Sequence, residues 1–476
     1  MCKIIGRDKE ISELKRRMGS GRPEFVVVYG RRRVGKTFLI NEVLHDNMTF
    51  HHTGLAPRGG RPAKMKDQLQ NFYFSLVRHG AEDATQPTTW LEAFFMLEQY
   101  LKRINNGSRQ VVFLDELQWM DTKRSGFLTA LEAFWNGWGN TQHNLFLVVC
   151  GSATSYILDN FIHEKGGMYG RVTDSIKLSP FTLKECEDFY SSRNIKMSHY
   201  NIAQAYMVMG GIPYYMDFFN PSYSLPQNID ALFFNKKAKL KGEFEHLFGS
   251  VFDHAEDCMA VIRTLGKRHY GYTRDEIARQ TGINANGDFT KVLTALEESD
   301  FIEKYLPFGY SKREVHYKLT DPFCWFWLHF MDDKVEHETD YWENHLNESE
   351  IASWRGIAFE EICFTHIRQI KNALEIGGVS TRESAMTIHD ENGKPTTQID
   401  LLIDRRDDIV NVCEIKYVRS QLNLSPAYIS TLRQRAEIVE QTFKGKTAHL
   451  TLIHTLDKSY RPEEFNSVIC LDQLFS

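Results

Sequence analysis

The sequence predicts an α/β protein of several domains, organised around a parallel sheet near its N-terminus. An apolar, β-branched run over 25–29 indicates a buried strand, and a glycine-containing loop and a helical pattern over 38–44 follow it. A second buried strand over 111–114 ends in two carboxylates. Nearer the C-terminus, strand patterns over 398–403 and 409–415 also carry carboxylates. These observations predict two α/β regions with charged side chains on their strands.

Residues 30–37 match the phosphate-binding P-loop pattern G-x-x-x-x-G-K-[ST]. A strand, a glycine loop and a helix N-terminus together aim backbone N–H groups at an anion. We therefore expect ATP here, with Lys36 reaching the β- and γ-phosphates and the Thr37 hydroxyl binding Mg²⁺. The residues expected around the nucleotide are Gly30, Arg31, Arg32, Arg33, Val34, Gly35, Lys36, Thr37 and Phe38.

Residues 3–18 precede the first strand and are typical of a turn followed by a helix, with Asp8 as the expected N-cap. This helix either only packs on the sheet or closes over the adenine of a bound nucleotide. In the second case Gly6 and Arg7 contribute to the nucleotide site.

The strand over 111–114 runs directly into Asp115 and Glu116, which is the Walker B arrangement. Hydrolysis of a bound nucleotide needs both carboxylates. We expect Asp115 to hold the Mg²⁺ shell and Glu116 to polarise the attacking water.

Three later positions are further candidates around the γ-phosphate. The strand over 145–150 leads to Ser152, our first candidate for a polar side chain beside that phosphate, with Thr154 second. The alternative is a simple strand-to-helix cap. Arg171 follows in a glycine-containing loop, and we favour an arginine finger over a structural ion pair.

Residues 181–250 are mostly helical and predict a lid-like piece. Gly210 and Gly211 break one helix, and Pro213 suits the first turn of the next. This kink either brings backbone and Pro213 near a nucleotide or is only a turn between helices.

Residues 256–320 have the pattern of a winged helix. The third helix, Asp288 to Glu298, is rich in acidic residues, which is unfavourable for phosphate contact. Lys312 and Arg313, at the tip of the expected wing, are better placed. We favour a role between domains over DNA reading.

The C-terminal region predicts a helix over 351–374, three strands, a helix and a further strand. Glu414 and Lys416 point to the same face of their strand, and Asp400 on the adjacent strand can meet them there. Two carboxylates and a lysine form a Mg²⁺ nuclease constellation, in which Asp400 and Glu414 ligate the metal and Lys416 acts on water and phosphate. The alternative is a surface strand with a Glu/Lys pair. A helix over 425–443 offers Arg433 and Arg435 to a nucleic-acid backbone.

Length, charge and cysteine content restrict the domains, partners and compartment that the sequence predicts. The 476 residues predict roughly three domains at about 150 residues each. The net charge of -5 provides no global field for nucleic acid, so any contact must be local. No apolar run approaches a membrane span, and the eight cysteines form no C-x-x-C pair. We expect a reduced, cytoplasmic protein without a membrane partner.

Several motifs carry a resemblance that covers nearly the whole chain. They are Ile5-Gly6-Arg7, the P-loop, Asp115-Glu116-Leu117-Gln118-Trp119, Gly151-Ser152, Tyr169-Gly170-Arg171, Gly211-Ile212-Pro213, Phe359-Glu360, Gln398-Ile399-Asp400 and Glu414-Ile415-Lys416. The first six resemble archaeal-type P-loop ATPases of the AAA+/STAND group. The last three are similar to PD-(D/E)XK nucleases, with Ile399 in place of the motif's proline.

The resemblance implies an ASCE-type P-loop core over 1–180, a helical lid over 181–254 and a winged helix over 255–325. An acidic linker over 326–350 and a restriction-endonuclease-like α/β domain over 351–476 follow. It also implies Glu360 as the helix carboxylate of the second site and Arg171 as the finger.

Two main functions remain open at this stage; a third, weaker hypothesis is a nucleotide-responsive DNA-binding regulator that uses the winged helix, and the acid-rich third helix argues against it. The first is an ATP-driven switch that controls a Mg²⁺-dependent nuclease acting on nucleic acid, with DNA favoured and a homo-oligomer possible. The second is an ATPase signalling module whose nuclease-like domain only binds nucleic acid or a protein. The complete set of Asp400, Glu414 and Lys416 favours the first.

Overall fold

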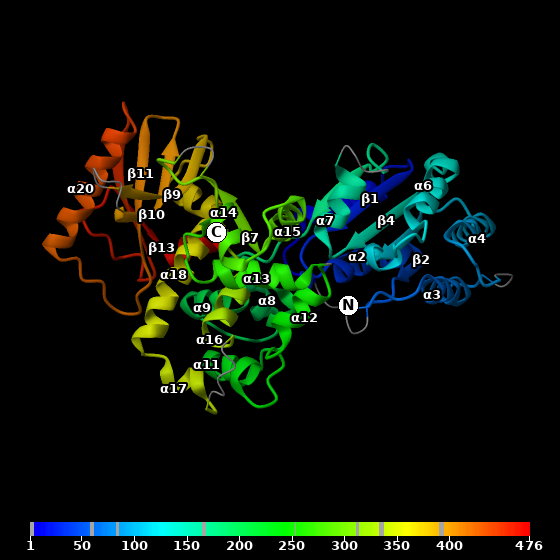
Figure 1. The fold of residues 1–476 in the computed structure, drawn as a ribbon, viewed down its shortest axis with the longest axis horizontal. Helices are drawn as coiled ribbons and strands as arrows, with labels where there is room; N and C mark the ends of the chain where they lie inside the picture. Colours follow the sequence, from blue (N-terminus) through cyan, green and yellow to red (C-terminus); the bar gives the residue numbers. More distant parts are fainter. Residues whose placement is uncertain are drawn as a thin grey trace. The chain divides into compact units, whose positions relative to one another are not determined.

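The protein, in a computed structural model, divides into two compact units, whose helices and strands are labelled in Figure 1. Unit 1 comprises Met1–Pro180, Glu245–Cys258 and Thr294–Ser299, and unit 2 comprises Phe181–Phe244, Met259–Leu293 and Asp300–Ser476. The structure describes residues 4–57, 61–81, 85–163, 168–252, 254–310, 314–332, 338–389 and 395–476. In this described part, none of the helices combines the length and apolar character of a membrane span.

Unit 1 is built on a parallel sheet of five strands in the order β2-β3-β4-β1-β5, which confirms the predicted parallel core. The strands are β1 (Glu24–Tyr29), β2 (Met48–Thr53), β3 (Gln110–Asp115), β4 (Leu145–Gly151) and β5 (Asp174–Lys177). Because the carboxyl ends of parallel strands meet at one edge, the segments that follow β1, β3 and β4 lie together.

Helices surround this sheet and complete a core of aromatic and aliphatic side chains. They are α1 (Asp8–Met18), α2 (Lys36–Leu44), α3 (Met65–Arg78), α4 (Trp90–Arg103), α5 (Leu117–Met120), α6 (Phe127–Gly137) and α7 (Thr154–Ile157). Phe25 of β1 packs against Trp135 of α6 with ring centroids 5.0 Å apart. Trp90 of α4 meets Phe127 of α6 edge-on at 4.9 Å. These contacts fix the sheet that carries the P-loop.

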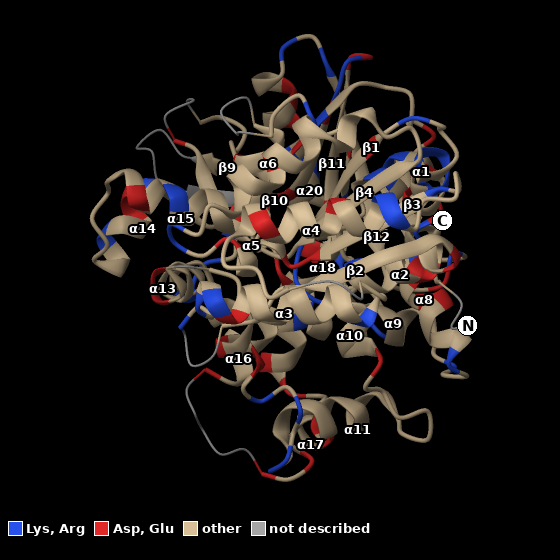
Figure 2. Ribbon diagram, turned by 90° about the vertical axis from the view of Figure 1, so that its right-hand side faces the viewer, with Lys and Arg blue, Asp and Glu red and all other residues tan. Residues whose placement is uncertain are grey.

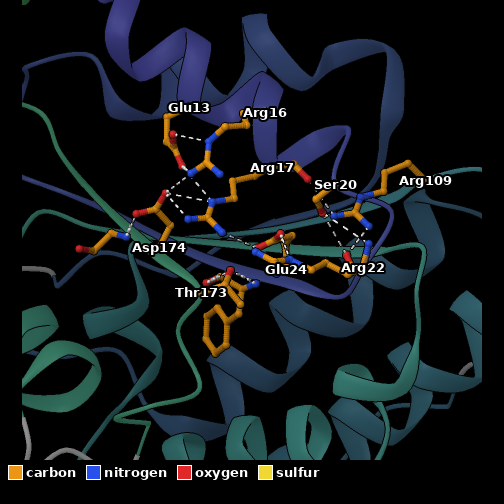
Figure 3. A network of polar contacts seen from close by, with 11 residues as sticks. Glu13, Arg16, Arg17, Ser20, Arg22, Glu24, Arg109, Thr173 and Asp174 are labelled. Atoms are coloured by element: carbon orange, nitrogen blue, oxygen red, sulfur yellow. Dashed lines mark hydrogen bonds and ion pairs between the residues drawn. The ribbon is translucent and has the colours of Figure 1, made fainter.

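Helix α1 is tied to the sheet by a network of arginines and carboxylates (Figure 3). Arg17 contacts Glu24 of β1 at 3.3 Å and Asp174 of β5 at 3.0 Å. The predicted N-cap was wrong by one residue: the helix begins at Asp8, and Arg7 is its N-cap with φ 66°. The reason is that Arg7 adopts the left-handed conformation that ends the preceding turn, so Asp8 is already helical.

The first part of unit 2 is helical, as predicted. Its helices are α8 (Leu183–Ser192), α9 (His199–Met209), α10 (Pro213–Met216) and α11 (Leu225–Ile229), and α12 spans Glu243–Gly249. The break between α9 and α10 needs glycine. A Cβ at Gly211 would lie 2.0 Å from the carbonyl oxygen of Phe181.

A small antiparallel sheet in the order β6-β8-β7 follows. The elements around it are α13 (Ala255–Leu265), β6 (Tyr272–Thr273), α14 (Arg274–Thr281), α15 (Gly287–Glu298), β7 (Ile302–Tyr305), β8 (His316–Leu319) and α16 (Pro322–Phe330). Thr273 caps α14 in a capping box with Glu276, as its sequence predicts. The two-residue strand β6 was not predicted, because it is too short to show a period. Lys312 and Arg313 lie outside the described residues.

Part of the predicted acidic linker is packed rather than solvated. It contains α17 (Tyr341–His345), whose Trp342 is 1% exposed. The backbone N–H groups of Trp342 and Glu343 donate to the Asp230 carboxylate at 2.8 and 3.0 Å. A distant carboxylate therefore satisfies this helix N-terminus, which the local charge pattern could not reveal.

The C-terminal region has a mixed sheet in the order β13-β12-β11-β10-β9. Its strands are β9 (Thr381–His389), β10 (Pro395–Arg405), β11 (Ile409–Lys416), β12 (Thr447–His454) and β13 (Ser467–Cys470), and its helices are α18 (Ser349–Thr365), α19 (Ile367–Ala373) and α20 (Pro426–Thr442). Strand β13 is additional to the prediction. Strand β10 is antiparallel to both neighbours, whereas β11, β12 and β13 are parallel.

The single helix predicted over 351–374 was wrong, because the chain breaks at His366 into α18 and α19. The imidazole Nδ1 lies 2.9 Å from the carbonyl oxygen of Ile362, and Nε2 accepts the Leu183 N–H at 3.0 Å. His366 thus bridges its own helix and α8, and this tertiary contact overrides the continuous helical pattern.

Candidate functional site

The P-loop connects β1 to α2 through a backbone path that requires glycine. Gly30 has φ 135°, and a Cβ there would lie 2.2 Å from the carbonyl oxygen of Leu178. Gly35 has φ 94° and precedes the first residue of α2. Only glycine adopts these conformations at low cost. The loop therefore reaches the helix N-terminus as the sequence predicts.

Lys36 lies folded back over the loop. Its Nζ donates to the carbonyl oxygens of Gly30 at 2.8 Å and Arg31 at 3.0 Å, and the residue is 5% exposed. A buried ammonium needs compensating acceptors. In this arrangement the backbone supplies them, so the cation is held at the mouth of the loop where phosphate oxygens would replace them.

Thr37 and Asp115 meet at the carboxyl edge of the sheet. The Thr37 hydroxyl donates to Asp115 Oδ2 at 2.9 Å. Asp115 Oδ1 is buried and accepts no hydrogen bond from the described residues. Burial and then the neighbouring Glu116 raise the pKa of Asp115 to about 6. A hydroxyl beside a carboxylate oxygen that lacks a partner fits Mg²⁺, which prefers oxygen ligands.

Glu116 has an unusual backbone, with φ 55°, and its carboxylate is held by neutral donors. Oε2 accepts from the Ser152 N–H at 3.1 Å, the Ser152 hydroxyl at 2.8 Å and the Gln118 amide at 2.5 Å. The structure therefore brings the first γ-phosphate candidate against Glu116. Thr154, the second candidate, has a buried hydroxyl oxygen that forms no hydrogen bond within the described chain.

Gln118 is the residue that sequence reasoning left without a role. Its amide lies 2.5 Å from Glu116 Oε2 and 3.1 Å from the Ser152 hydroxyl. The only signal was its position two residues after Glu116.

The segment before α1 reaches the P-loop. Gly6 and Arg7 have φ 60° and 66°, and the Arg7 guanidinium donates to the carbonyl oxygen of Val34 at 3.4 Å. Of the other loop residues, Arg31 is 2% exposed, Arg32 contacts Ser250, and Phe38 is 44% exposed. The N-terminal segment is thus placed against the loop.

Arg171 lies at the opposite edge of the sheet from the P-loop. The Thr173 N–H donates at 2.8 Å to the carbonyl oxygen of Phe25, near the start of β1, whereas the P-loop follows the end of that strand. At roughly 3.3 Å per residue, the two edges are about 13 Å apart. The guanidinium contacts Glu132 at 2.8 Å and Asn136 at 2.9 Å. If Arg171 acts as an arginine finger, it therefore acts on a nucleotide bound to a neighbouring copy of the chain.

Pro213 starts α10 in unit 2. The carbonyl oxygen of Gly211 accepts the Phe181 N–H at 2.7 Å, which holds this turn within that unit. Pro213 thus belongs to unit 2, whereas the P-loop belongs to unit 1.

A second group of charged side chains lies in the C-terminal sheet. The antiparallel register pairs Leu401 with Cys413, so Asp400 and Glu414 are the next facing residues. The register of β10 against β9 shifts between Ile399 and Leu402, which is a bulge beside Asp400. Asp400 Oδ2 accepts the Ile415 N–H at 3.3 Å. Asp400 and Glu414 therefore lie on adjacent strands, as the sequence predicts.

Glu414 is 5% exposed and is surrounded by donors. Its carboxylate contacts Lys416 Nζ at 2.5 Å and Arg435 at 3.4 Å, and it accepts a hydrogen bond from the Tyr428 hydroxyl. Burial opposes the charge on Lys416, but Glu414 raises the pKa of this lysine above its usual value. Arg435, which the sequence offered to nucleic acid, instead pairs with Glu414. Tyr428 was not predicted, and its place one turn into α20 was the only signal.

Glu360 of α18 faces the same group of carboxylates. Burial and then Asp400 raise the pKa of Glu360 to about 9. Burial and then Glu414 raise the pKa of Asp400 to about 6. Glu361 points elsewhere and contacts Lys318 at 3.0 Å. The structure thus separates the two neighbouring glutamates.

No group of three or more His, Cys, Asp or Glu side chains within the described ranges is arranged to hold a metal ion. We call the group of Glu360, Asp400, Glu414 and Lys416 the acidic site. In it, the Glu414 carboxylate contacts cationic side chains of the protein. A metal there would have to displace Lys416 or Arg435 from this carboxylate.

The helices of the predicted winged helix have no continuous basic face. Helix α14 carries Arg274 and Arg279 beside Asp275 and Glu276. Figure 2 shows both basic and acidic segments on the ribbon around α14 and α15. On α15, Lys291 is paired with Asp288 at 2.9 Å. This agrees with the expectation that α15 is a poor phosphate reader.

Comparison with known proteins supports the assignment of the P-loop region as a nucleotide-binding site. Residues 4–218 match the family model described as an ATPase domain predominantly from Archaea. The chain is 24% identical over 367 residues to an uncharacterized protein of Methanocaldococcus jannaschii, covering 75% of this chain and 76% of that protein.

Two solved structures are similar at low identity. A Walker-type ATPase of Pyrococcus abyssi has a TM-score of 0.48 and 16% identity, covering 69% of this chain and 96% of that one. Cdc6p of Pyrobaculum aerophilum has a TM-score of 0.34 and 13% identity, covering 76% of this chain and 95% of that one. The family match and the P-loop geometry together support a P-loop ATPase domain within residues 4–218 that is similar to the archaeal type. The acidic site lies beyond residues 4–218, which the family model matches.

Proposed function

We propose that the protein is an ATP-hydrolysing switch that controls a Mg²⁺-dependent nuclease-like domain acting on nucleic acid. In unit 1, Lys36 binds the β- and γ-phosphates, and Thr37 and Asp115 hold Mg²⁺, which offsets phosphate charge. Glu116 orients the attacking water, with Ser152 beside the γ-phosphate. Asp115 Oδ1, which accepts no hydrogen bond from the described residues, supports the metal assignment.

The same proposal assigns catalysis to the C-terminal site. Asp400 and Glu414 bind the divalent cation, Lys416 acts on water and phosphate, and Glu360 supports them. One observation carries this assignment: desolvation, and then repulsion from the Asp400, Glu361 and Glu414 carboxylates, raises the pKa of Glu360 to about 9. A cation among them relieves that repulsion.

A second candidate is an ATPase whose C-terminal domain binds nucleic acid or a protein without cutting it. The contacts of Glu414 favour it. This carboxylate is already matched by Lys416, Arg435 and Tyr428, so the site is neutralised without a metal.

The proposal includes further assignments that the sequence made. We assign residues 255–325 to a winged-helix module with a role between domains, and residues 351–476 to the nuclease-like domain. We also propose that the protein works in the cytoplasm, and that Arg171 serves a neighbouring copy in a homo-oligomer.

The test is cleavage of labelled single- and double-stranded DNA and RNA with Mg²⁺ or Mn²⁺, with and without ATP. Wild type should cut at least one substrate, Asp400→Asn should not, and Lys36→Ala should cut without responding to ATP. Cleavage that survives Asp400→Asn would contradict the proposed site. Substrate binding without cleavage in wild type would favour the second candidate.

A further inference from the structure

Unit 2 contains a cavity of about 620 Å³ outside both sites described above. Its lining residues come from β6, α14, β7, β8, β9, β10 and the loops beside them. The rings of Tyr270, Tyr305 and Tyr310 line it. Its size is in the range of small-ligand sites, which are about 300–1,000 Å³.

Some polar groups at this cavity are already engaged. Arg268 pairs with Glu276 at 3.2 Å and lies over the Tyr270 ring at 4.9 Å. The Tyr305 hydroxyl donates to the carbonyl oxygen of Tyr270 at 2.6 Å. Because the cation of Arg268 is matched by a carboxylate, this pair does not favour a phosphate as the main ligand group.

Other polar groups are available to a ligand. The Gln398 side-chain amide lines the cavity and makes no hydrogen bond to the described residues. His316 Nδ1 is hydrogen-bonded to the carbonyl oxygen of Glu314 at 2.8 Å. Its Nε2 makes no hydrogen bond within the described chain. The cavity thus combines tyrosine side chains with an amide that both donates and accepts.

This combination fits a planar heterocycle whose edge carries donors and acceptors. Bases stack on tyrosine rings without regard to sequence, and a glutamine amide pairs with the donor and acceptor of adenine. We propose that this cavity binds a nucleobase, either of a single strand or of a free nucleoside. Tyr270 and Tyr305 supply stacking, and Gln398 contacts the base edge.

The proposal goes beyond the function proposed above and needs neither cleavage nor a metal. Gln398 precedes Asp400 by two residues on β10, so a base held here would fix a strand near the acidic site. A failure of base binding would leave the cleavage test unaffected, and a failure of cleavage would leave this test unaffected.

Binding is measured by fluorescence anisotropy on the full chain in EDTA without ATP. The probes are a labelled adenine-containing single strand, an abasic strand of equal length, and adenosine as competitor. Wild type should bind the base-bearing strand about tenfold more tightly than the abasic strand. Tyr270→Ala and Gln398→Ala should lose this difference, and Tyr270→Phe should keep it because the ring remains.

Tyr223→Ala is the matched control, because Tyr223 is also exposed in unit 2 but lies outside the cavity lining. It should bind like wild type. If adenosine competes at concentrations similar to those of the strand, the natural ligand is a free nucleoside. If adenosine competes only weakly, the natural ligand is a base within a single strand. Equal affinity for base-bearing and abasic strands, or an unchanged difference in the two alanine variants, would overturn the proposal.

Discussion

The P-loop site and the C-terminal acidic site each contain a buried carboxylate beside other acidic side chains, but they balance the charge differently. At the P-loop, Asp115 and Glu116 are held mainly by neutral donors, and one oxygen of Asp115 has no partner within the described residues. At the acidic site, Glu414 is matched by Lys416 and Arg435. The first site is arranged to receive a cation, whereas the second must exchange protein cations for one.

This difference has an energetic consequence. Buried ion pairs offset a large desolvation cost only when their geometry is good. A metal ion that displaces the Arg435 guanidinium from Glu414 leaves this guanidinium exposed to solvent or to a phosphate. Cation binding at the second site is therefore expected to be weaker, and to strengthen when nucleic acid accepts the released arginine.

The largest effect is expected from the P-loop half. Glu116→Gln should lower the kcat for ATP by about 10²–10⁴-fold, because water activation is lost while phosphate and Mg²⁺ contacts remain. Lys36→Ala should abolish nucleotide binding. Turnover and binding of a labelled ATP analogue measure the two separately, and a Glu116→Gln variant as fast as wild type would contradict the role of Glu116.

Arg171 tests whether the first site is complete within one chain. If Arg171 serves a neighbouring copy, Arg171→Ala should lower turnover by about 10³-fold with little change in ATP affinity. Wild-type turnover per chain should also rise with protein concentration. Glu132→Ala is the matched control, because it removes the ion pair and keeps the cation. Equal losses of turnover and thermal stability in both variants would identify a structural pair.

At the second site, Lys416→Ala should keep the metal and lose cleavage. The lysine is assigned to water and phosphate, so a general acid–base contribution of about 10²-fold or more should disappear. Comparing cleavage rates with metal-dependent thermal shifts separates the roles. If Lys416→Ala cuts at the wild-type rate, the lysine is only a charge partner of Glu414.

A smaller effect concerns how acid acts on unit 2. Burial lowers the pKa of His366 from 6.5 to about 4, so the unfolded chain binds this proton first as the pH falls. The contribution of neutral His366 to the free energy of unfolding is therefore fully present above pH 6.5. It falls by about 1.4 kcal/mol per pH unit as the pH drops from 6.5 toward 4. His366→Asn should lower the melting temperature at pH 7 but flatten its pH dependence. Parallel pH curves for both proteins would contradict this.

The sequence predicted those features that depend on local patterns. The P-loop path follows from glycines that alone tolerate the backbone at Gly30 and Gly35, and strand alternation put Glu414 and Lys416 on one face. Features set by distant partners were missed. His366 breaks a helix to contact Leu183, and Asp230 holds the N-terminus of α17. Arg171 and Arg435 have ion-pair partners far away in sequence, so their positions needed the fold.

The central claim is that the acidic site accepts a divalent cation, and a thermal shift without nucleotide tests it most directly. Mg²⁺ or Mn²⁺ should raise the melting temperature of the full chain. Asp400→Asn should remove the part of this shift that comes from the acidic site, and Asp115→Asn should remove only the part that comes from the P-loop. An unchanged shift in Asp400→Asn, or none in wild type, would contradict the account.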